Sequence, residues 1–463
     1  MLSHQRLTKT TSLPSLNSKP KVIDLRAEFP TAKHLGNSSG AKAVASFMEK
    51  NKCLSSAVVA KDGEIVAEVY KGSTRETKEQ LFSSTKSVMS ILFGLMEKEG
   101  LIKPDDRLGH IWNPSEHGNL WRKIKDHHYK KYIRIDSLLN HSSGLKPPTE
   151  KLDLLDILTI FADFGTIGGI SIVDSLNPSK YVFPKSLGTN IDYIRPCLEV
   201  TQKNNDTHLY IDPTDNSKKC RQWDYYIAGN IFSYIIQKQT GMTPKEYASR
   251  KFFPGLGIEN PKWLVNIDHI EYSGGGLMLT ARQHLKIAQF MLQGARISPH
   301  HSQLLTSDWI RRATGKLIQI RENRWFGYQW YVGNGNRYQS SGAFGQIIGI
   351  NETTKTIASI FSHETVKINN INVPCIQKDN GDILAVAKNL LALIDSANFE
   401  PEPLVDIFQE NPGYCQQYSD PMKGDNCSED YGDETRRTWM LKNCAKSCSE
   451  RHFPRFNIDI EKS

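Results

Sequence analysis

The pattern of apolar and polar positions predicts strands near both ends of the chain and helices between them. Apolar residues recur at helical spacing over 41–51, and two strand-like runs follow, 55–60 and 64–70, joined by Lys61-Asp62-Gly63. Asp-Gly between two such runs favours a tight β-hairpin. Strand patterns return later, before a last helix at about 381–398, at 326–332, 337–339, 346–350 and 356–362.

The most apolar helix pattern begins at Ser83. The run from Val88 to Met96 is apolar on nearly every face, which is typical of a helix in a protein interior. From about 103 to 265 the sequence is rich in helix and loop patterns, including a second apolar helix over 231–239. The order predicts an α/β fold: a discontinuous antiparallel sheet flanked by helices, with an all-helical insert packed on one side. A cleft between two such lobes is a usual place for a site.

Length and composition permit a large core and exclude several classes of protein. The chain has 463 residues, of which 38% are apolar and 23% charged, enough for one large domain with extensions. The net charge of +8 is spread out, and the densest basic stretch, Arg122 to Arg134, is interpreted as a solvated face rather than a nucleic-acid site. No apolar run reaches membrane-spanning length. No metal constellation or cofactor motif is visible.

The two ends of the chain differ from the middle in composition. Residues 1–35 are rich in Ser, Thr, Lys and Pro, lack the apolar segment of a signal peptide, and are predicted to form a flexible tail. Residues 399–412 carry three prolines and are interpreted as a linker. Four of the eight cysteines crowd into 413–451, which predicts a disulfide-rich module and a secreted or luminal location. The other four are interpreted as core residues or free thiols: Cys53, Cys197, Cys220 and Cys375.

Ser83 and Lys86 are the strongest candidates for chemistry. Their spacing places both side chains on one face of the first helical turn. The positive end of the helix dipole favours negative charge on the serine oxygen. A lysine held partly out of water shifts towards its neutral form and can accept a proton. Ser-x-x-Lys also occurs as a helix cap followed by a surface lysine, but such a cap rarely precedes an all-apolar helix. A nucleophile beside a base is the minimum equipment for acyl transfer.

Six stretches, taken in order, resemble the β-lactamase-related serine hydrolases. That superfamily includes class C β-lactamases, D-Ala-D-Ala peptidases, family VIII esterases and 6-aminohexanoate-dimer hydrolases. The resemblance covers roughly residues 40–398 and implies a hydrolase domain over 36–398. The stretches are Phe82-Ser83-Ser84-Thr85-Lys86, Leu138-Leu139-Asn140-His141-Ser142-Ser143-Gly144-Leu145, Trp223-Asp224-Tyr225, Ser273-Gly274-Gly275-Gly276-Leu277, Phe326-Gly327-Tyr328-Gln329-Trp330 and Ser341-Gly342-Ala343-Phe344-Gly345-Gln346.

The resemblance implies a Ser-Lys-Tyr mechanism. Ser83 forms the acyl-enzyme, Lys86 shares its proton, and Tyr225 acts as base and then as acid for the leaving group. Tyr226 remains an alternative, because many members have Tyr-Ser-Asn or Tyr-Ala-Asn where this chain has Tyr225-Tyr226-Ile227. His141 would be needed for a Ser-His-Asp arrangement, but the resemblance implies a structural role for its loop.

Ser340-Ser341-Gly342 occupies the place of the family's Lys-Thr-Gly or His-x-Gly strand. Gly342 lets that strand approach the substrate, and the backbone N–H groups of Ala343 and Ser83 are expected to form the oxyanion hole. A serine at position 340, in place of a cation, favours a small ester or amide substrate over a β-lactam. Two alternatives stay open: a catalytically inactive scaffold that binds peptides or sugars, and a true β-lactamase or D-peptidase.

The C-terminal cysteines are similar in spacing to the end of ShK toxin-like modules. Pairing as in that module implies the disulfides Cys415–Cys444 and Cys427–Cys448, and a recognition module for a protein or glycan partner. Four thiolates around zinc are a weaker alternative, because no Cys-x2-Cys knuckle is present.

Overall fold

The computed structural model describes residues 19–113, 115, 131, 133–143, 231–265, 269–363, 365–368, 371–375 and 383–401. Its helices are α1 (Ser39–Lys50), η1 (Phe82–Ser84), α2 (Thr85–Lys98), α3 (Leu108–Ile111), α6 (Ile135–Leu139), α10 (Ile231–Thr240), α11 (Pro244–Lys251), η4 (Phe253–Leu256), α12 (Ala281–Leu292), α13 (Ser307–Ala313), η5 (Ala343–Gly345) and α14 (Ile383–Ser396). Its strands are β1 (Leu54–Lys61), β2 (Glu64–Tyr70), β3 (Glu79–Gln80), β4 (Lys262–Trp263), β5 (Leu277–Leu279), β6 (Ile318–Arg321), β7 (Arg324–Phe326), β8 (Tyr331–Val332), β9 (Arg337–Ser341), β10 (Ile347–Asn351), β11 (Thr356–Ser362), β12 (Thr365–Ile368) and β13 (Ile371–Pro374).

The predicted discontinuous antiparallel sheet is confirmed. Within the described residues, eight strands follow the order β2-β1-β11-β10-β9-β8-β7-β6. The early hairpin joins the late strands through β1 and β11, which pair antiparallel from Leu54 opposite Ser362 to Lys61 opposite Thr356. The hairpin turn has left-handed backbone at Asp62 (φ 49°) and Gly63 (φ 81°), as a tight two-residue turn requires.

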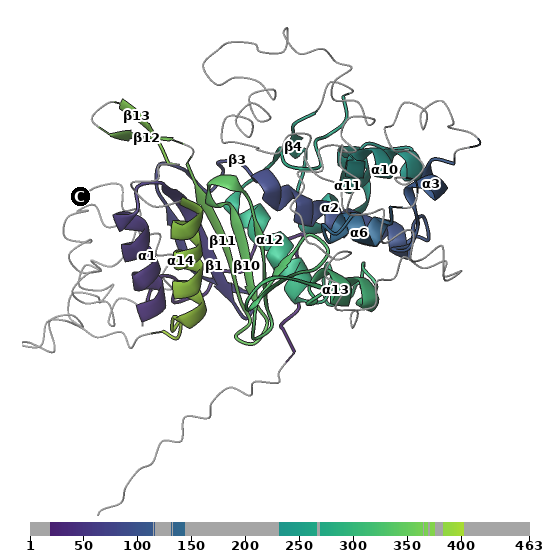
Figure 1. Cartoon of the computed structure of the whole chain (residues 1–463). Coiled ribbons are helices and arrows are strands. Elements are labelled where there is room, and N and C mark those ends of the chain that lie inside the picture. Colours follow the sequence, from purple (N-terminus) through teal and green to yellow (C-terminus); the bar gives the residue numbers. More distant parts are fainter. Residues whose placement is uncertain are drawn as a thin grey trace, which may run out of the picture.

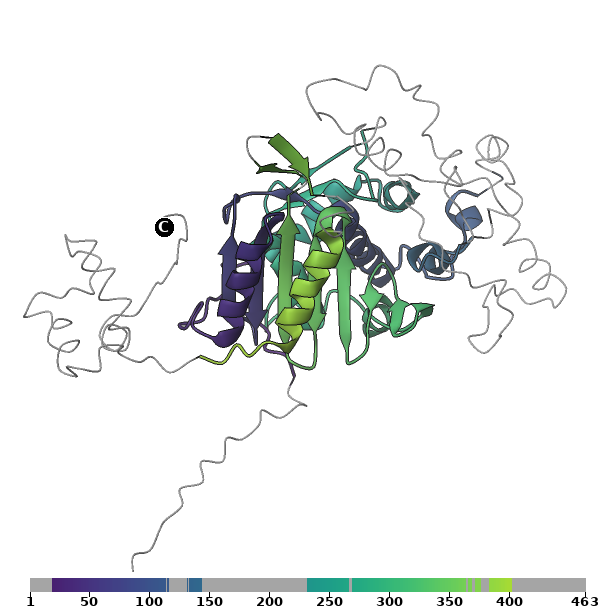
Figure 2. The same cartoon turned by 60° about the vertical axis from the view of Figure 1, so that its left-hand side comes forward.

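Helices cover both faces of this sheet around β1, β10 and β11, whose residues are buried at nearly every position. Helices α1 and α14 lie side by side on one face (Figures 1 and 2), where Val59 and Ile360 pack with Leu390 and Ile394. Helix α12 lies against the other face, with α2 beyond it (Figure 1), and the larger apolar core there includes Val58 of β1 and Leu285 of α12.

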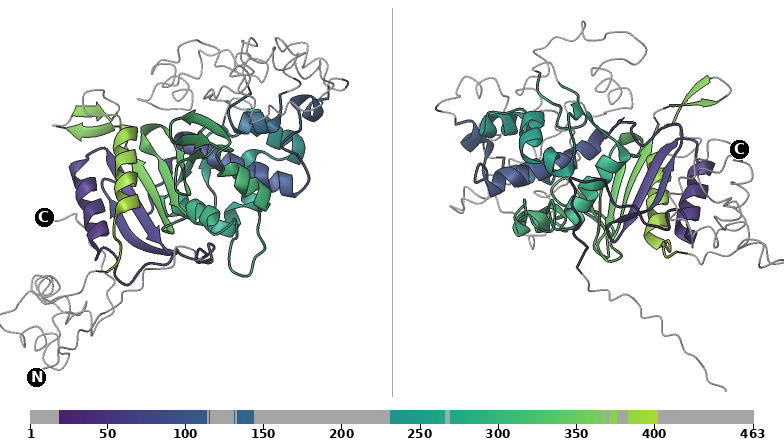
Figure 3. Two further views of the ribbon diagram at one scale, coloured as in Figure 1. Left: turned by 60° about the horizontal axis from the view of Figure 1, so that its bottom comes forward. Right: turned by 180° about the vertical axis from the view of Figure 1, so that it is seen from behind.

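The described helices of the insert pack beside α2, away from α1 and α14 (Figure 3). The rings of Phe93 in α2 and Phe232 in α10 meet edge to face, with centroids 5.3 Å apart. The hydroxyl of Tyr247 in α11 donates to the carboxylate of Glu99, which follows α2, at 3.1 Å. Helix α2 is therefore enclosed by the sheet lobe and the helical lobe.

Two sequence predictions need correction. The flexible tail was expected to reach residue 35, but Ile23, Leu25 and Phe29 are buried in the main core. The amide of Ile65 donates to Pro30 and the amide of Ala32 to Ile65, so this segment joins the edge of β2. The strand expected over 326–332 is two short strands, because Gln329 between them has left-handed backbone (φ 63°).

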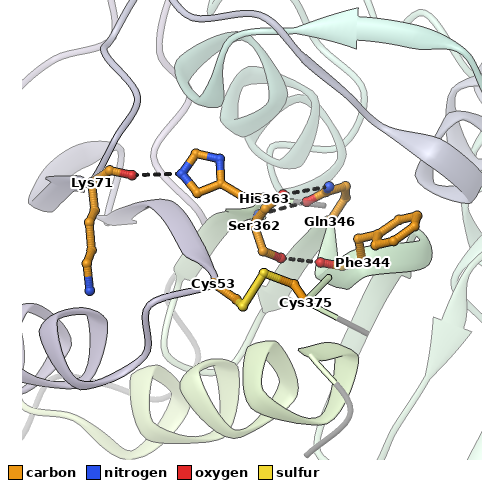
Figure 4. Close-up of a disulfide and its surroundings, with 7 residues drawn as sticks. All are labelled: Cys53, Lys71, Phe344, Gln346, Ser362, His363 and Cys375. Atoms are coloured by element: carbon orange, nitrogen blue, oxygen red, sulfur yellow. Dashed lines mark hydrogen bonds between the residues drawn. A yellow bond between two sulfur atoms is a disulfide. The ribbon is translucent and has the colours of Figure 1, made fainter. Parts of the chain in front are cut away.

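Cys53 and Cys375 form a disulfide between residues 322 positions apart, which corrects their interpretation as core residues or free thiols. Figure 4 shows this bond near the end of β11. The amide of His363 donates to the carbonyl of Cys53 at 2.8 Å, while Ser362 exchanges hydrogen bonds with the amide of Gln346 and donates to the carbonyl of Phe344. The disulfide thus lies close to the polar contacts that hold η5.

Several predicted features lie outside the described residues: Tyr225, Tyr226, most of the linker, and the C-terminal cysteine module with both of its expected disulfides. Among the described helices, none is long and apolar enough to span a membrane.

Candidate active site

Ser83 lies in the short turn η1 and is more exposed than its neighbours. It is the one residue between Leu81 and Met96 that is not buried. The turn begins where the amide of Leu81 donates to the carbonyl of Leu277 at 2.8 Å, and it continues through η1 into α2. Phe82, just before the serine, has left-handed backbone (φ 46°), an uncommon conformation that is often found at functional sites. The serine is therefore presented to solvent from an otherwise closed element.

Lys86 lies one turn further along and points at the serine. Its Nζ is 2.8 Å from Ser83 Oγ and 2.8 Å from the carbonyl oxygen of Gly274. The residue is only 2% exposed. Burial lowers the pKa of Lys86 to about 7. In its neutral form the amine can donate one hydrogen to Gly274 and direct its lone pair at the serine hydroxyl.

The glycine-rich stretch after Tyr272 supplies this carbonyl. The indole Nε1 of Trp263 lies 3.0 Å from the carbonyl of Tyr272 and 3.2 Å from that of Gly275, which orients the loop. A side chain at Gly274 would meet the ring of Tyr272 at 2.6 Å, and one at Gly275 would meet the backbone of Phe82 at 3.5 Å. Glycine is therefore needed at position 274 for the path of this loop past Tyr272, whereas position 275 has room for a Cβ beside the turn that carries Ser83.

The two serines at the end of β9 point in opposite directions. Ser341 lines a pocket with Ser83, Lys86, Ser87, Phe326, Gln329 and Tyr331. Ser340 is 1% exposed and faces the interior, where its hydroxyl lies 2.5 Å from that of Ser84. Opposite orientations are expected for neighbouring residues of a strand. Ser341 rather than Ser340 is therefore available to a substrate.

Gly342 and Ala343, which follow β9, lie against the turn that carries Ser83. A side chain at Gly342 would approach the carbonyl oxygen of Leu81 to 2.3 Å, so only glycine allows this contact between strand and turn. The rings of Phe82 and Phe344 pack with centroids 4.8 Å apart, so aromatic residues adjoining Ser83 and Ala343 hold the two segments together. This packing brings the backbone around Ala343 near the turn of Ser83, where an oxyanion hole is expected.

Gln329 fixes the far wall of the pocket. Its backbone amide and its side-chain amide both donate to the carbonyl of Leu139, at 3.0 and 2.7 Å. Its own carbonyl accepts from the hydroxyl of Ser87 at 2.6 Å. The residue therefore ties α2 to the end of α6. The Phe-Gly-Tyr-Gln-Trp stretch marked this wall in the sequence, but it did not reveal the turn that aims Gln329.

His141 is a packed residue of this wall. It is 3% exposed, its Nε2 is 3.1 Å from the side-chain oxygen of Gln329, and its ring lies 5.1 Å from that of Phe326. Burial, and then the charge of Lys86, lower the pKa of His141 to about 3, so the ring is neutral. The hydrogen bond orients a neutral imidazole and leaves no role as a charged partner of Ser83.

The phenol expected from the other lobe, Tyr225, lies outside the described residues. Tyr331, which the sequence analysis did not single out, does line the pocket. Its ring meets that of Phe326 edge to face, with centroids 4.9 Å apart. Short strands with few residues, such as β8, give a weak sequence signal, which is why this residue was missed. Among the described residues, no cluster of three or more potential ligands suits a metal ion.

A buried chain of hydrogen bonds begins at Ser84, the residue after Ser83. The hydroxyl of Ser84 is 3.1 Å from Nε2 of His284, and Nδ1 of that ring is 3.0 Å from the hydroxyl of Ser359. With Ser340, these residues join η1 to β9, α12 and β11. Burial lowers the pKa of His284 to about 3, so its neutral ring donates at one nitrogen and accepts at the other.

Replacing His284 by leucine is expected to lower the free energy of unfolding by about 2–4 kcal/mol, because two buried hydroxyls lose a partner. Urea denaturation measures this change. The double variant Ser84→Ala with His284→Leu should lose less than the sum of the two single variants, because it removes both ends of one hydrogen bond. Strict additivity would show that the two side chains do not interact.

Comparison with known proteins agrees with this architecture. Residues 41–162 match the β-lactamase family model. A search of curated proteins finds no match. Among solved structures, the chain is similar to a Bacillus anthracis protein whose description assigns it to the 6-aminohexanoate-dimer hydrolases (16% identity, TM-score 0.52), covering 81% of this chain and 89% of that one. It is also similar to the octameric penicillin-binding protein homologue from Pyrococcus abyssi (17% identity, TM-score 0.51), covering 80% of each chain.

At 16% and 17% identity the two structures establish only the fold. Any catalytic activity has to be argued from the residues of this chain. The antiparallel sheet flanked by helices matches the fold of these two structures. The chain therefore has the β-lactamase fold, and the family match over 41–162 supports a hydrolase of that fold.

Proposed function

We propose that this protein is a serine hydrolase that cleaves an ester or a small amide through an acyl-enzyme on Ser83. The observation that carries the proposal is the 2.8 Å contact between Ser83 Oγ and the buried Nζ of Lys86. A serine hydroxyl is a weak nucleophile until a base removes its proton. An amine whose pKa is about 7 is partly neutral near neutral pH and can do so.

In the proposed reaction, neutral Lys86 takes the hydroxyl proton while Ser83 Oγ bonds to the carbonyl carbon of the substrate. The resulting oxyanion accepts hydrogen bonds from the backbone N–H groups of Ser83 and Ala343. The leaving alcohol or amine takes a proton as its bond to carbon breaks, and water then releases the acyl group by the reverse transfers. Tyr225 is the proposed proton donor to the leaving group.

The pocket favours an ester or small amide over a β-lactam. In the described part of the chain, Lys86 is its one cationic lining residue, and this amine is engaged with Ser83 and Gly274. Ser340 stands where the family has a lysine or histidine, and its uncharged side chain points into the core. This position therefore contributes no positive charge to the pocket. A true β-lactamase or D-peptidase is accordingly the weaker candidate, and a chromogenic cephalosporin tests it directly.

Hydrolysis of 4-nitrophenyl butanoate by the purified chain tests the proposal. Ser83→Ala is expected to lower kcat/KM by about 10³-fold or more, because the acyl-enzyme cannot form. Circular dichroism should show an unchanged fold. Full activity in Ser83→Ala would refute the mechanism, whereas an inactive wild type that still binds ligands would favour the alternative of a binding scaffold.

The disulfide supports a proposed secreted or luminal location, because such bonds persist mainly in oxidising compartments. The proposed C-terminal module, with Cys415–Cys444 and Cys427–Cys448, agrees with that location and is proposed to bind a protein or glycan partner. Mass spectrometry of unreduced peptides from the native protein would test all three bonds.

A further inference from the structure

The pocket continues along one face of the sheet. Arg324 and Phe326 are two residues apart in β7 and therefore share a face. The strand register pairs Phe326 with Tyr331 and Tyr331 with Gln339, so these residues lie on that face as well. The amide of Gln339 in turn donates to the hydroxyl of Ser341 at 2.8 Å. A row of aromatic and polar side chains thus leads away from Ser83, and Arg324 lies at its far end.

Arg324 lies against Tyr331 of the pocket lining, and no described carboxylate pairs with it. Its guanidinium carbon is 4.6 Å from the centroid of the Tyr331 ring, and the residue is partly buried. Burial lowers the pKa of Arg324; Tyr331 opposes this effect and the charge of Arg321 adds to it. Among the described residues, no carboxylate contributes to the electrostatic environment of Arg324.

Partial burial of the Arg324 guanidinium without an opposite charge is energetically unfavourable, and an anionic ligand would offset this penalty. Removing a charge from water is unfavourable when no opposite charge compensates. The guanidinium has five donors in a planar fork, which match the two oxygens of a carboxylate. The ring of Tyr331, stacked on the guanidinium of Arg324, restricts its orientation. Binding a carboxylate would therefore cost little further side-chain entropy.

We propose that Arg324, held by Tyr331, is a specificity-determining residue that binds a carboxylate on the substrate, at a distance from the scissile ester or amide. This inference rests on the proposed hydrolase function. Strands β7 and β9 are separated by one strand, and the register places Arg324 level with Arg337, four residues before Ser341. Two strand spacings across the sheet and four residues along β9 put the backbones of Arg324 and Ser341 roughly 16 Å apart, and the arginine side chain spans part of this distance where it lies over Tyr331. The substrates would therefore be half-esters or amides of dicarboxylic acids, or esters and amides whose leaving group carries a carboxylate.

Two pairs of substrates test the proposal, one for each side of the scissile bond. On the acyl side, 4-nitrophenyl hydrogen adipate is compared with its methyl ester. On the leaving side, 4-(butanoyloxy)benzoate is compared with its methyl ester. In at least one pair, wild-type kcat/KM is expected to favour the anion by about 10- to 100-fold, the value of a charged hydrogen bond. The preference should fall as salt is added.

Two variants separate Arg324 from a general effect of positive charge. Arg324→Gln should reduce the preference to about one, and Arg324→Lys should keep part of it. Arg321→Gln is the matched control, because Arg321 is exposed and directly opposite Arg324 in the strand register. It removes the same charge and should leave the preference in place.

The failures are distinguishable. If no ester is hydrolysed, neutral or anionic, the proposed function is wrong. If the neutral esters are hydrolysed through Ser83 but neither pair shows a preference, the carboxylate subsite is wrong. A preference that survives in Arg324→Gln, or disappears equally in Arg321→Gln, would also overturn it.

Discussion

Replacing Lys86 by methionine should lower kcat/KM for 4-nitrophenyl butanoate by about 10³-fold or more, because Ser83 loses the base that removes its proton. Methionine keeps the length of the side chain and removes a buried amine, so the fold should be retained or slightly stabilised. Lys98→Met, at the exposed end of the same helix, is the matched control and should keep wild-type activity. Equal losses in both variants would contradict a specific role for Lys86.

The same amine should set the pH dependence of the wild type. Only neutral Lys86 can accept the serine proton, and burial places its pKa at about 7. Values of kcat/KM for a neutral ester should therefore rise as pH increases through about 7 and level off above it. A rate that is flat across this range, or that falls with increasing pH, would show that another group is the base.

Substituting Gly342 by alanine should be the next most damaging change. The added carbon would lie 2.3 Å from the carbonyl oxygen of Leu81 and 3.1 Å from the side chain of Phe82. The strand end and the nucleophile turn would have to separate, which displaces Ala343 from the expected oxyanion hole. A misplacement of this kind, or the loss of one donor, costs about 10²-fold in kcat.

Gly333→Ala is the matched control, because its added carbon would meet no atom nearer than the carbonyl oxygen of Arg337 at 3.7 Å. It should keep activity. Thermal melts of both variants separate a loss of stability from a loss of rate. If Gly342→Ala kept full kcat, the close contact between strand and turn would have no part in catalysis.

The sequence predicted the elements whose signal is local. The helix after Ser83 was recognisable because a helix apolar on nearly every face must be enclosed, and every residue from Thr85 to Met96 is buried. The hairpin was recognisable because Asp62-Gly63 suits left-handed backbone at both positions. Together with the strand patterns late in the chain, these two features predicted the discontinuous sheet.

The details of the site depended on contacts that no local pattern encodes. The alternation of β9 decides whether Ser340 or Ser341 faces the pocket, and the register that sets it comes from pairing with β10. Gln329 itself takes the left-handed backbone that glycine or asparagine usually adopts, and Gly327, two residues earlier, is the one local sign of a break in the strand. His284 is an ordinary polar position of an amphipathic helix until Ser84 and Ser359 lie beside it.

The disulfide is a further case. Cys53 and Cys375 are 322 residues apart, and spacing alone cannot pair cysteines across a whole domain. In the sequence, the prediction of an oxidising compartment rested instead on the four cysteines crowded near the C-terminus. The structure adds a bond within the described domain, close to the segment that carries Ala343 and Phe344.

Covalent labelling tests the central claim most directly. The purified protein is treated with a fluorophosphonate at a pH above 7, digested, and analysed by mass spectrometry to locate the modified residue. The geometry predicts one stoichiometric adduct on Ser83, and little or none in Lys86→Met. An adduct on Ser84 or on a serine elsewhere, or undiminished labelling without the lysine, would contradict it.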